Sequence, residues 1–83
     1  MATSRIDIRR WFKDGKKSGA THMIVVCDTW DWEDYPVYVK PDEKVREKYA
    51  EYNNKNMQKV MEVYSLKKDM ENQLNEVRAF HFD

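Results

Sequence analysis

The segment from residue 19 to residue 39 constrains the fold more than any other part of the chain. Its two ends, residues 22–28 and 35–39, are rich in valine and in other residues favoured in strands. The loop between them, within residues 28–35, carries four acidic residues and two tryptophans. Large aromatic rings in a loop are expensive to leave in water, so we expect something to cover or use them. The segment therefore predicts an antiparallel hairpin that presents acidic and aromatic side chains.

The first of these strands, residues 22–28, is apolar on both of its faces. The odd-numbered residues within 23–27 (Met, Val and Cys) point one way, and Ile24 and Val26 point the other. Such a strand needs cover on both sides. In the second strand, Pro36 lacks an amide donor, which places it at the start or the edge of that strand.

A helix is predicted before the hairpin, over residues 4–18. Thr3 or Ser4 is a suitable N-cap. One apolar face then recurs at helical spacing through Ile8, Trp11, Phe12 and Gly15. Gly19 fits the left-handed position that ends a helix.

Residues 42–78 are predicted to be helical, as one long helix or as several. Pro41–Asp42 suits a helix start, and apolar residues recur at helical spacing from Val45 to Val77. Asn53–Asn54 is a plausible break, and Ser65 could start a third segment. This much helix exceeds what a small hairpin can cover, so we expect part of it to pack against another subunit.

The predicted fold class is therefore α+β, in the order α-β-β-α-α. It consists of an N-terminal helix, a two-stranded antiparallel hairpin and a long or broken helical region, in a single domain over residues 1–83. With 83 residues, 36% of them charged, and a mean hydropathy of −0.97, one core stabilises such a chain only marginally. We expect a homo-oligomer that completes the core; a marginal monomer is the alternative.

The charges are balanced overall but separated along the chain. Residues 1–17 carry six bases against two acids, a net charge of +4, whereas residues 28–34 carry a net charge of −4. A net charge of zero makes nucleic-acid binding an unfavoured interpretation, although a local basic site for a phosphorylated ligand stays open. The single cysteine, a polar N-terminus and the absence of a long apolar run together predict a cytoplasmic protein without a membrane partner.

Catalytic patterns fit the chain poorly. His22 and Cys27 would face opposite sides of a strand, so they do not form a nucleophilic pair. Read as a calcium loop from Asp28, the sixth position is Glu33 instead of glycine and the twelfth is Val39 instead of glutamate. A looser Mg²⁺ site at Asp28 and Asp31 is the remaining metal alternative. We predict no enzymatic activity, no catalytic residues, no metal site and no cofactor.

The aromatic loop favours binding instead. A nucleobase can stack on tryptophan rings while arginine or lysine side chains hold phosphates. The candidate ligand-binding residues are Arg9, Arg10, Lys13, Asp28, Thr29, Trp30, Trp32 and Tyr35. Two alternatives stay open: one tryptophan covers the core while the other lies at a subunit interface, or the loop contacts a different protein.

The pattern GATHMIVVCDT…DYPVYV over residues 19–39, followed by residues 45–52, resembles a group of small uncharacterised proteins of tailed-phage genomes. This resemblance implies a phage accessory protein of the host cytoplasm, a class in which many members act against host defence, and supplies no functional residues. The leading hypothesis is a non-enzymatic homo-oligomer that sequesters a nucleotide-derived host immune signal. The alternative is an inhibitor that binds a host defence protein through the acidic-aromatic loop.

Overall fold

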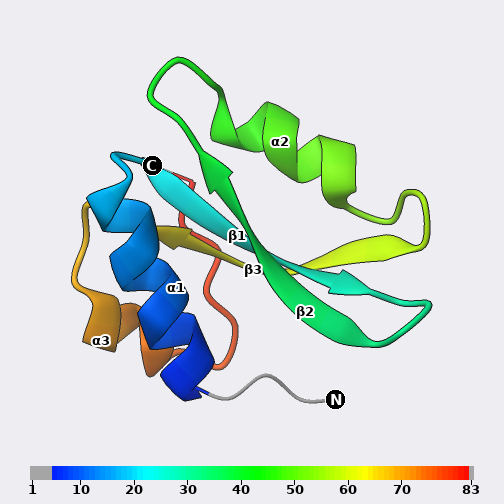
Figure 1. The fold of residues 1–83 in the computed structure, drawn as a ribbon, viewed down its shortest axis with the longest axis horizontal. Coiled ribbons are helices and arrows are strands. Elements are labelled where there is room, and N and C mark those ends of the chain that lie inside the picture. The colour runs from blue at the N-terminus through cyan, green and yellow to red at the C-terminus, as the bar shows by residue number, and fades with distance from the viewer. Residues whose placement is uncertain (1–4, 83) are drawn as a thin grey trace.

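The structure, a computed structural model, describes residues 5–82, which form three helices around a three-stranded sheet (Figure 1). The strands stand in the order β2-β1-β3, and β1 pairs antiparallel with both neighbours. In chain order the elements are α1 (Arg5–Lys17), β1 (His22–Asp28), β2 (Glu33–Val39), α2 (Val45–Tyr52), β3 (Gln58–Ser65) and α3 (Met70–Leu74).

The predictions for the first helix and the first strand are confirmed. Helix α1 spans Arg5–Lys17 and turns Ile8, Phe12 and Gly15 towards the core. Gly19 has the expected left-handed backbone, with φ +83°. The expected N-cap, Thr3 or Ser4, lies outside the described residues.

Strand β1 is covered on both faces, as its apolar pattern predicts. On one face, Met23 and Val25 pack with Phe12 of α1 and Leu74 of α3. On the other face, Ile24 and Val26 belong to a second cluster, against which α2 packs through Val45, Tyr49 and Tyr52. Figure 1 shows α1 and α3 together on one side and α2 apart from them.

The predicted fold class is wrong in its second half, because the sheet has a third strand. Residues 42–78 are not helical throughout: only α2 and the short α3 are helices, and β3 lies between them. Strand β3 pairs with β1 from His22↔Ser65 to Asp28↔Gln58. The order is therefore α-β-β-α-β-α, and the hairpin is part of a larger sheet.

A β-bulge explains why β3 has the spacing of a helix. The β1–β3 register shifts between Val25 and Val26, so that Val25 faces Glu62 and Val26 faces Val60, with Met61 extra. Apolar residues therefore fall at 60, 61, 63 and 64: Val60 and Val63 belong to the α2-side cluster, whereas Met61 and Tyr64 pack on the α1 side. A bulged strand that is buried on both faces thus imitates the i, i+3, i+4 pattern.

The boundaries of α2 differ from the prediction at one end only. Asp42 does not cap it, since the helix starts at Val45 after Lys44, which makes no capping side-chain hydrogen bond. The predicted break at Asn53–Asn54 is confirmed by the end of α2 at Tyr52. Because β3 packs within the sheet, there is no surplus helix, and that argument for self-association falls away.

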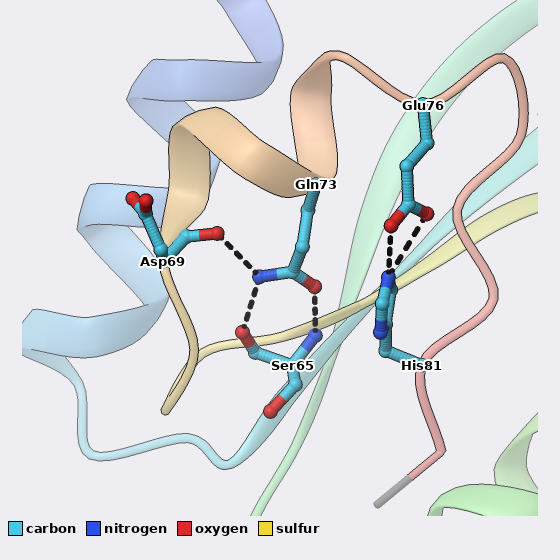
Figure 2. A network of polar contacts seen from close by, with 5 residues as sticks. All are labelled: Ser65, Asp69, Gln73, Glu76 and His81. Carbon is cyan, nitrogen blue, oxygen red and sulfur yellow. Dashed lines mark hydrogen bonds and ion pairs between the residues drawn. The ribbon is translucent and has the colours of Figure 1, made fainter.

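The outer edge of β3 is closed by groups from its own chain. The Gln73 side chain accepts a hydrogen bond from the Ser65 N–H at 2.8 Å and donates one to the Ser65 carbonyl at 2.9 Å (Figure 2). Further along the edge, the Val63 N–H donates to the Ala79 carbonyl and the Val63 carbonyl accepts from the His81 N–H. His81 is in turn held by both carboxylate oxygens of Glu76, at 2.9 and 3.0 Å (Figure 2). Ser65 does not start a helix; Asp69 caps α3 instead, accepting from the Glu71 N–H.

Candidate functional site

The turn between β1 and β2 is a four-residue connection, Thr29–Trp32, held by Asp28. The Asp28 carbonyl accepts from the Trp32 N–H at 2.6 Å, and the Asp28 carboxylate accepts from the Trp30 N–H at 2.9 Å. Trp32 closes the turn in a left-handed conformation, with φ 58°. Both tryptophans therefore belong to the turn and not to an extension of the strand.

A second loop, residues 53–57 between α2 and β3, lies against this turn. Thr29 joins the two loops, because its N–H and its hydroxyl each donate to the Met57 carbonyl at 2.8 Å. We call the surface formed by residues 29–32 and 53–57 the two-loop end; Figure 1 shows both connections at the same end of the sheet.

Backbone strain within the described residues gathers at the two-loop end. Non-glycine residues with positive φ cost free energy, and such outliers are frequent at functional sites. In residues 5–82 they are Trp32, Asn54, Asn56 and Met57, all of which lie in these two loops. The contacts of the surrounding structure hold the loops in conformations that the backbone alone disfavours.

Three side chains of the two-loop end are large, apolar and exposed. Trp30 exposes 73% of its surface, Trp32 56% and Met57 54%. The Lys59 ammonium lies over the Trp32 ring, 5.4 Å from its centroid. Asp31 in the turn and Glu33 beside it are also exposed. Lys55 of the second loop is exposed as well, so the negative charge belongs to the tryptophan turn and its flank, and the second loop adds a positive charge.

Tyr35, the last of the candidate loop residues, has a different place. It packs against the cluster on the α2 side of the sheet, and its hydroxyl accepts a hydrogen bond from the Gln58 side chain. Burial, with a smaller effect of the nearby Tyr52, raises the pKa of the Tyr35 hydroxyl. Tyr35 therefore supports the loop from within the fold.

The basic candidates on α1 lie away from the two-loop end, towards the opposite side of the view in Figure 1. Arg9 makes a two-pronged contact with Glu71 of α3, at 3.0 and 2.9 Å, and Arg10 pairs with Asp7 at 3.2 Å. Lys13 is exposed. Since the aromatic and basic halves of the predicted ligand site are separate, one chain does not assemble them around a common ligand.

The outward side of α1 carries a shallow hollow of about 510 Å³. Most of its lining residues are basic: Ile6, Arg9, Arg10, Lys13, Asp14 and Lys17. The guanidinium of Arg9, one of the lining residues, lowers the pKa of the Glu71 carboxyl through a hydrogen bond. This face offers positive charge without aromatic rings.

Cys27 is buried near the two-loop end. Burial, followed by the effects of Asp34, raises the pKa of its thiol, which disfavours the reactive thiolate. Within residues 5–82, no group of three or more His, Cys, Asp or Glu side chains is arranged to hold a metal ion. In the same residues no helix has both the length and the apolar character needed to cross a bilayer.

Sequence reasoning missed Met57 and Lys59 as neighbours of the tryptophan turn. Both follow Asn53–Asn54, which the sequence predicts to be a break between helices. The useful signal is the concentration of asparagine at positions 53, 54 and 56, because asparagine tolerates the left-handed backbone of tight loops. Comparison with family models, curated proteins and solved structures finds nothing that matches this chain.

Proposed function

We propose that this protein acts by binding another macromolecule and not by catalysis, with the two-loop end as its contact surface. The observation that carries the proposal is the joint exposure of Trp30, Trp32 and Met57 on two loops that are hydrogen-bonded to each other. Exposed apolar clusters of this kind mark interaction sites. Tryptophan and methionine are also enriched at protein interfaces, and tryptophan is frequent among the residues that dominate binding energy.

The charge around the rings favours a partner with a cationic surface. Asp31 and Glu33 flank the tryptophans and are exposed, so they attract and orient positive charge during encounter. Tryptophan faces also accept lysine and arginine side chains, as Trp32 accepts Lys59 within the chain. Combined with the resemblance to phage accessory proteins, this favours a host protein of the cytoplasm as the target.

Sequestration of a nucleotide-derived signal by a homo-oligomer is the second candidate function. It is favoured by the basic hollow on α1, since Arg10, Lys13 and Lys17 could hold phosphate groups there. The stacking rings would have to come from the two-loop end of another copy. This candidate therefore requires an oligomer, whereas protein binding does not.

The test of the leading proposal compares the tagged wild type and two tagged variants as bait in host-cell extract, followed by titration calorimetry with the purified captured protein. We expect the wild type to bind one partner stoichiometrically. Trp30→Ala together with Trp32→Ala should weaken binding by more than about tenfold, as expected for buried anchor residues. Val77→Ala is the control, because Val77 is also an exposed apolar residue, with 96% of its surface exposed. It follows α3 in the chain and lies outside the two-loop end. Equal binding by the tryptophan variant and the control would refute the proposal.

The second candidate is tested with defined ligands. Calorimetric titration with cyclic dinucleotides and ADP-ribose derivatives should give saturable heat if the oligomer sequesters such a signal, and Lys13→Glu should abolish it. The ratio of absorbance at 260 and 280 nm of the purified protein reports any nucleotide that co-purifies. Flat titrations across the panel with a folded oligomer would eliminate this candidate.

A further inference from the structure

The two edges of the sheet are poorly suited to pairing with another strand. On β3, Ser65 and Val63 already use their outward N–H and C=O groups, with Gln73 and with residues 79–81 respectively. On β2, the other edge strand, Pro36 interrupts the row of backbone donors. An association between copies through this sheet is therefore disfavoured, and side-chain surfaces are left as the means of contact.

The outward face of α1 is one such surface. Arg10, Lys13 and Lys17 follow each other along the helix at intervals of three and four residues, and Ile6 continues this stripe with 72% of its surface exposed. Arg9 pairs with Glu71 and Arg10 pairs with Asp7, whereas Lys13 and Lys17 are exposed along the hollow, which also contains Asp14. The face is thus cationic with an apolar residue at one end.

The two-loop end has the complementary character. Its tryptophan turn presents the exposed Asp31 carboxylate, with exposed Glu33 directly after the turn, next to the apolar Trp30 and Trp32; the one exposed lysine, Lys55, lies on the second loop. Within one chain α1 covers one face of the sheet and lies apart from the two connections that form the two-loop end (Figure 1). Opposite charge and exposed apolar groups on both surfaces suit a contact between two molecules, in which lysine ammonium groups approach carboxylates and tryptophan faces.

We propose that the chain associates with itself head to tail, with the two-loop end of one copy seated on the α1 face of the next. This inference rests on the proposed function, since it uses the same contact surface; a host protein that binds the two-loop end therefore displaces the neighbouring copy. The contact joins two different patches, so it is heterologous: repeated around an axis it closes a ring, and otherwise it extends as a filament. In either assembly each junction places Trp30 and Trp32 of one copy beside Lys13 and Lys17 of the next.

The test uses charge reversal on each side, read out by native mass spectrometry and by light scattering after size exclusion. One variant carries Lys13→Glu and Lys17→Glu; the other carries Asp31→Lys and Glu33→Lys. The matched control, Lys44→Glu with Lys67→Glu, makes the same charge change at exposed lysines outside both surfaces. Far-UV circular dichroism and urea unfolding confirm that each variant is folded.

We expect the wild type to form species at multiples of its 10.1 kDa chain mass. Its association should weaken by about tenfold or more between 50 and 500 mM salt, because exposed charges are screened. Each reversal alone should weaken association by at least about tenfold, and a one-to-one mixture of the two should restore it, because opposite charges again face each other. The control should associate like the wild type.

Three results would overturn the inference. The first is a wild type that stays at 10.1 kDa up to about millimolar concentration, where even weak contacts form. The second is that the reversal variants associate like the wild type. The third is that their mixture fails to restore association. The two proposals remain separable. If self-association is absent but a host protein is still captured in a Trp30-dependent manner, only the head-to-tail contact is refuted. If Trp30→Ala together with Trp32→Ala changes neither self-association nor the capture of a host protein, both proposals are refuted.

Discussion

Gln73 is the residue whose replacement tests the sheet-edge arrangement most directly. Its side chain is buried and makes three hydrogen bonds, two with the backbone of Ser65 and one with the Asp69 carbonyl, at 2.8, 2.9 and 3.1 Å (Figure 2). The amide thus takes the place of a neighbouring strand at the end of β3. We predict that Gln73→Leu, which keeps most of the volume and removes both polar groups, destabilises the fold.

The magnitude follows from the groups that lose their partners. Ser65 is fully buried, so its N–H and its carbonyl would be left unsatisfied, at a cost of about 1–3 kcal/mol each. Local opening of the edge to water reduces the sum, which gives an expected loss of about 3 kcal/mol. A chain of 83 residues has a free energy of unfolding of about 4–12 kcal/mol, so this loss is a large fraction of the total.

The assay is equilibrium urea unfolding followed by circular dichroism, with two controls. Asn72→Leu places the same side chain at an exposed neighbouring position of α3 and should change the free energy of unfolding by less than about 0.5 kcal/mol. Ser65→Ala removes a buried hydroxyl that has no hydrogen-bond partner among the described residues, and should be neutral or stabilising. A Gln73→Leu variant within about 1 kcal/mol of the wild type would refute the reasoning, because the edge would then not depend on these hydrogen bonds.

Three further predictions concern the thiol, the glycine turn and the α1–α3 contact. The Cys27 thiol, whose pKa is raised by burial and by Asp34, should react with a disulfide reagent at pH 8 at least about tenfold more slowly in the native protein than in urea; equal rates would contradict the burial. Gly19→Ala should lower the free energy of unfolding by about 1–2 kcal/mol, because φ is +83° there and nothing surrounds the added Cβ; an unchanged urea midpoint would count against the strain. Arg9 lowers the folded-state pKa of Glu71 below 4.5, so the stabilisation from this pair is present above pH 4.5 and is lost as the pH falls through the lowered pKa. The difference in urea midpoint between wild type and Glu71→Gln should therefore shrink from pH 7 to pH 3, and a constant difference would exclude this linkage.

Local patterns were sufficient for the first half of the fold. Helix α1 has one regular apolar face ending in Gly19, and β1 is a continuous apolar run, so each could be recognised from neighbouring residues alone. Strand β3 could not, because the bulge at Met61 shifts the phase of its side chains and produces helical spacing. The valines at positions 60 and 63 are the local signal that favours a strand, because branched side chains are enriched in strands.

The same distinction holds for the candidate site. The tryptophans and acids of the turn are contiguous in sequence, so their presence in one turn is predictable, whereas the sequence left open whether a tryptophan covers the core, and both are exposed. Met57 joins them only through the contact with Thr29, 28 residues earlier in the chain. The separation of Arg9, Arg10 and Lys13 from the turn follows from the direction in which α1 packs, which no local pattern encodes.

The central position of β1 determines what happens while the chain is being synthesised. Strand β1 leaves the ribosome long before β3, since the paired residues His22 and Ser65 are 43 positions apart. Until residues 58–65 emerge, one edge of an almost entirely apolar strand lacks its neighbour and resembles the exposed edges that nucleate aggregation. Translation that stops before Gln58 leaves this edge permanently open. Residues 58–65 therefore cover the edge of β1 that is otherwise open to aggregation. We expect premature termination to yield insoluble protein instead of a smaller folded one.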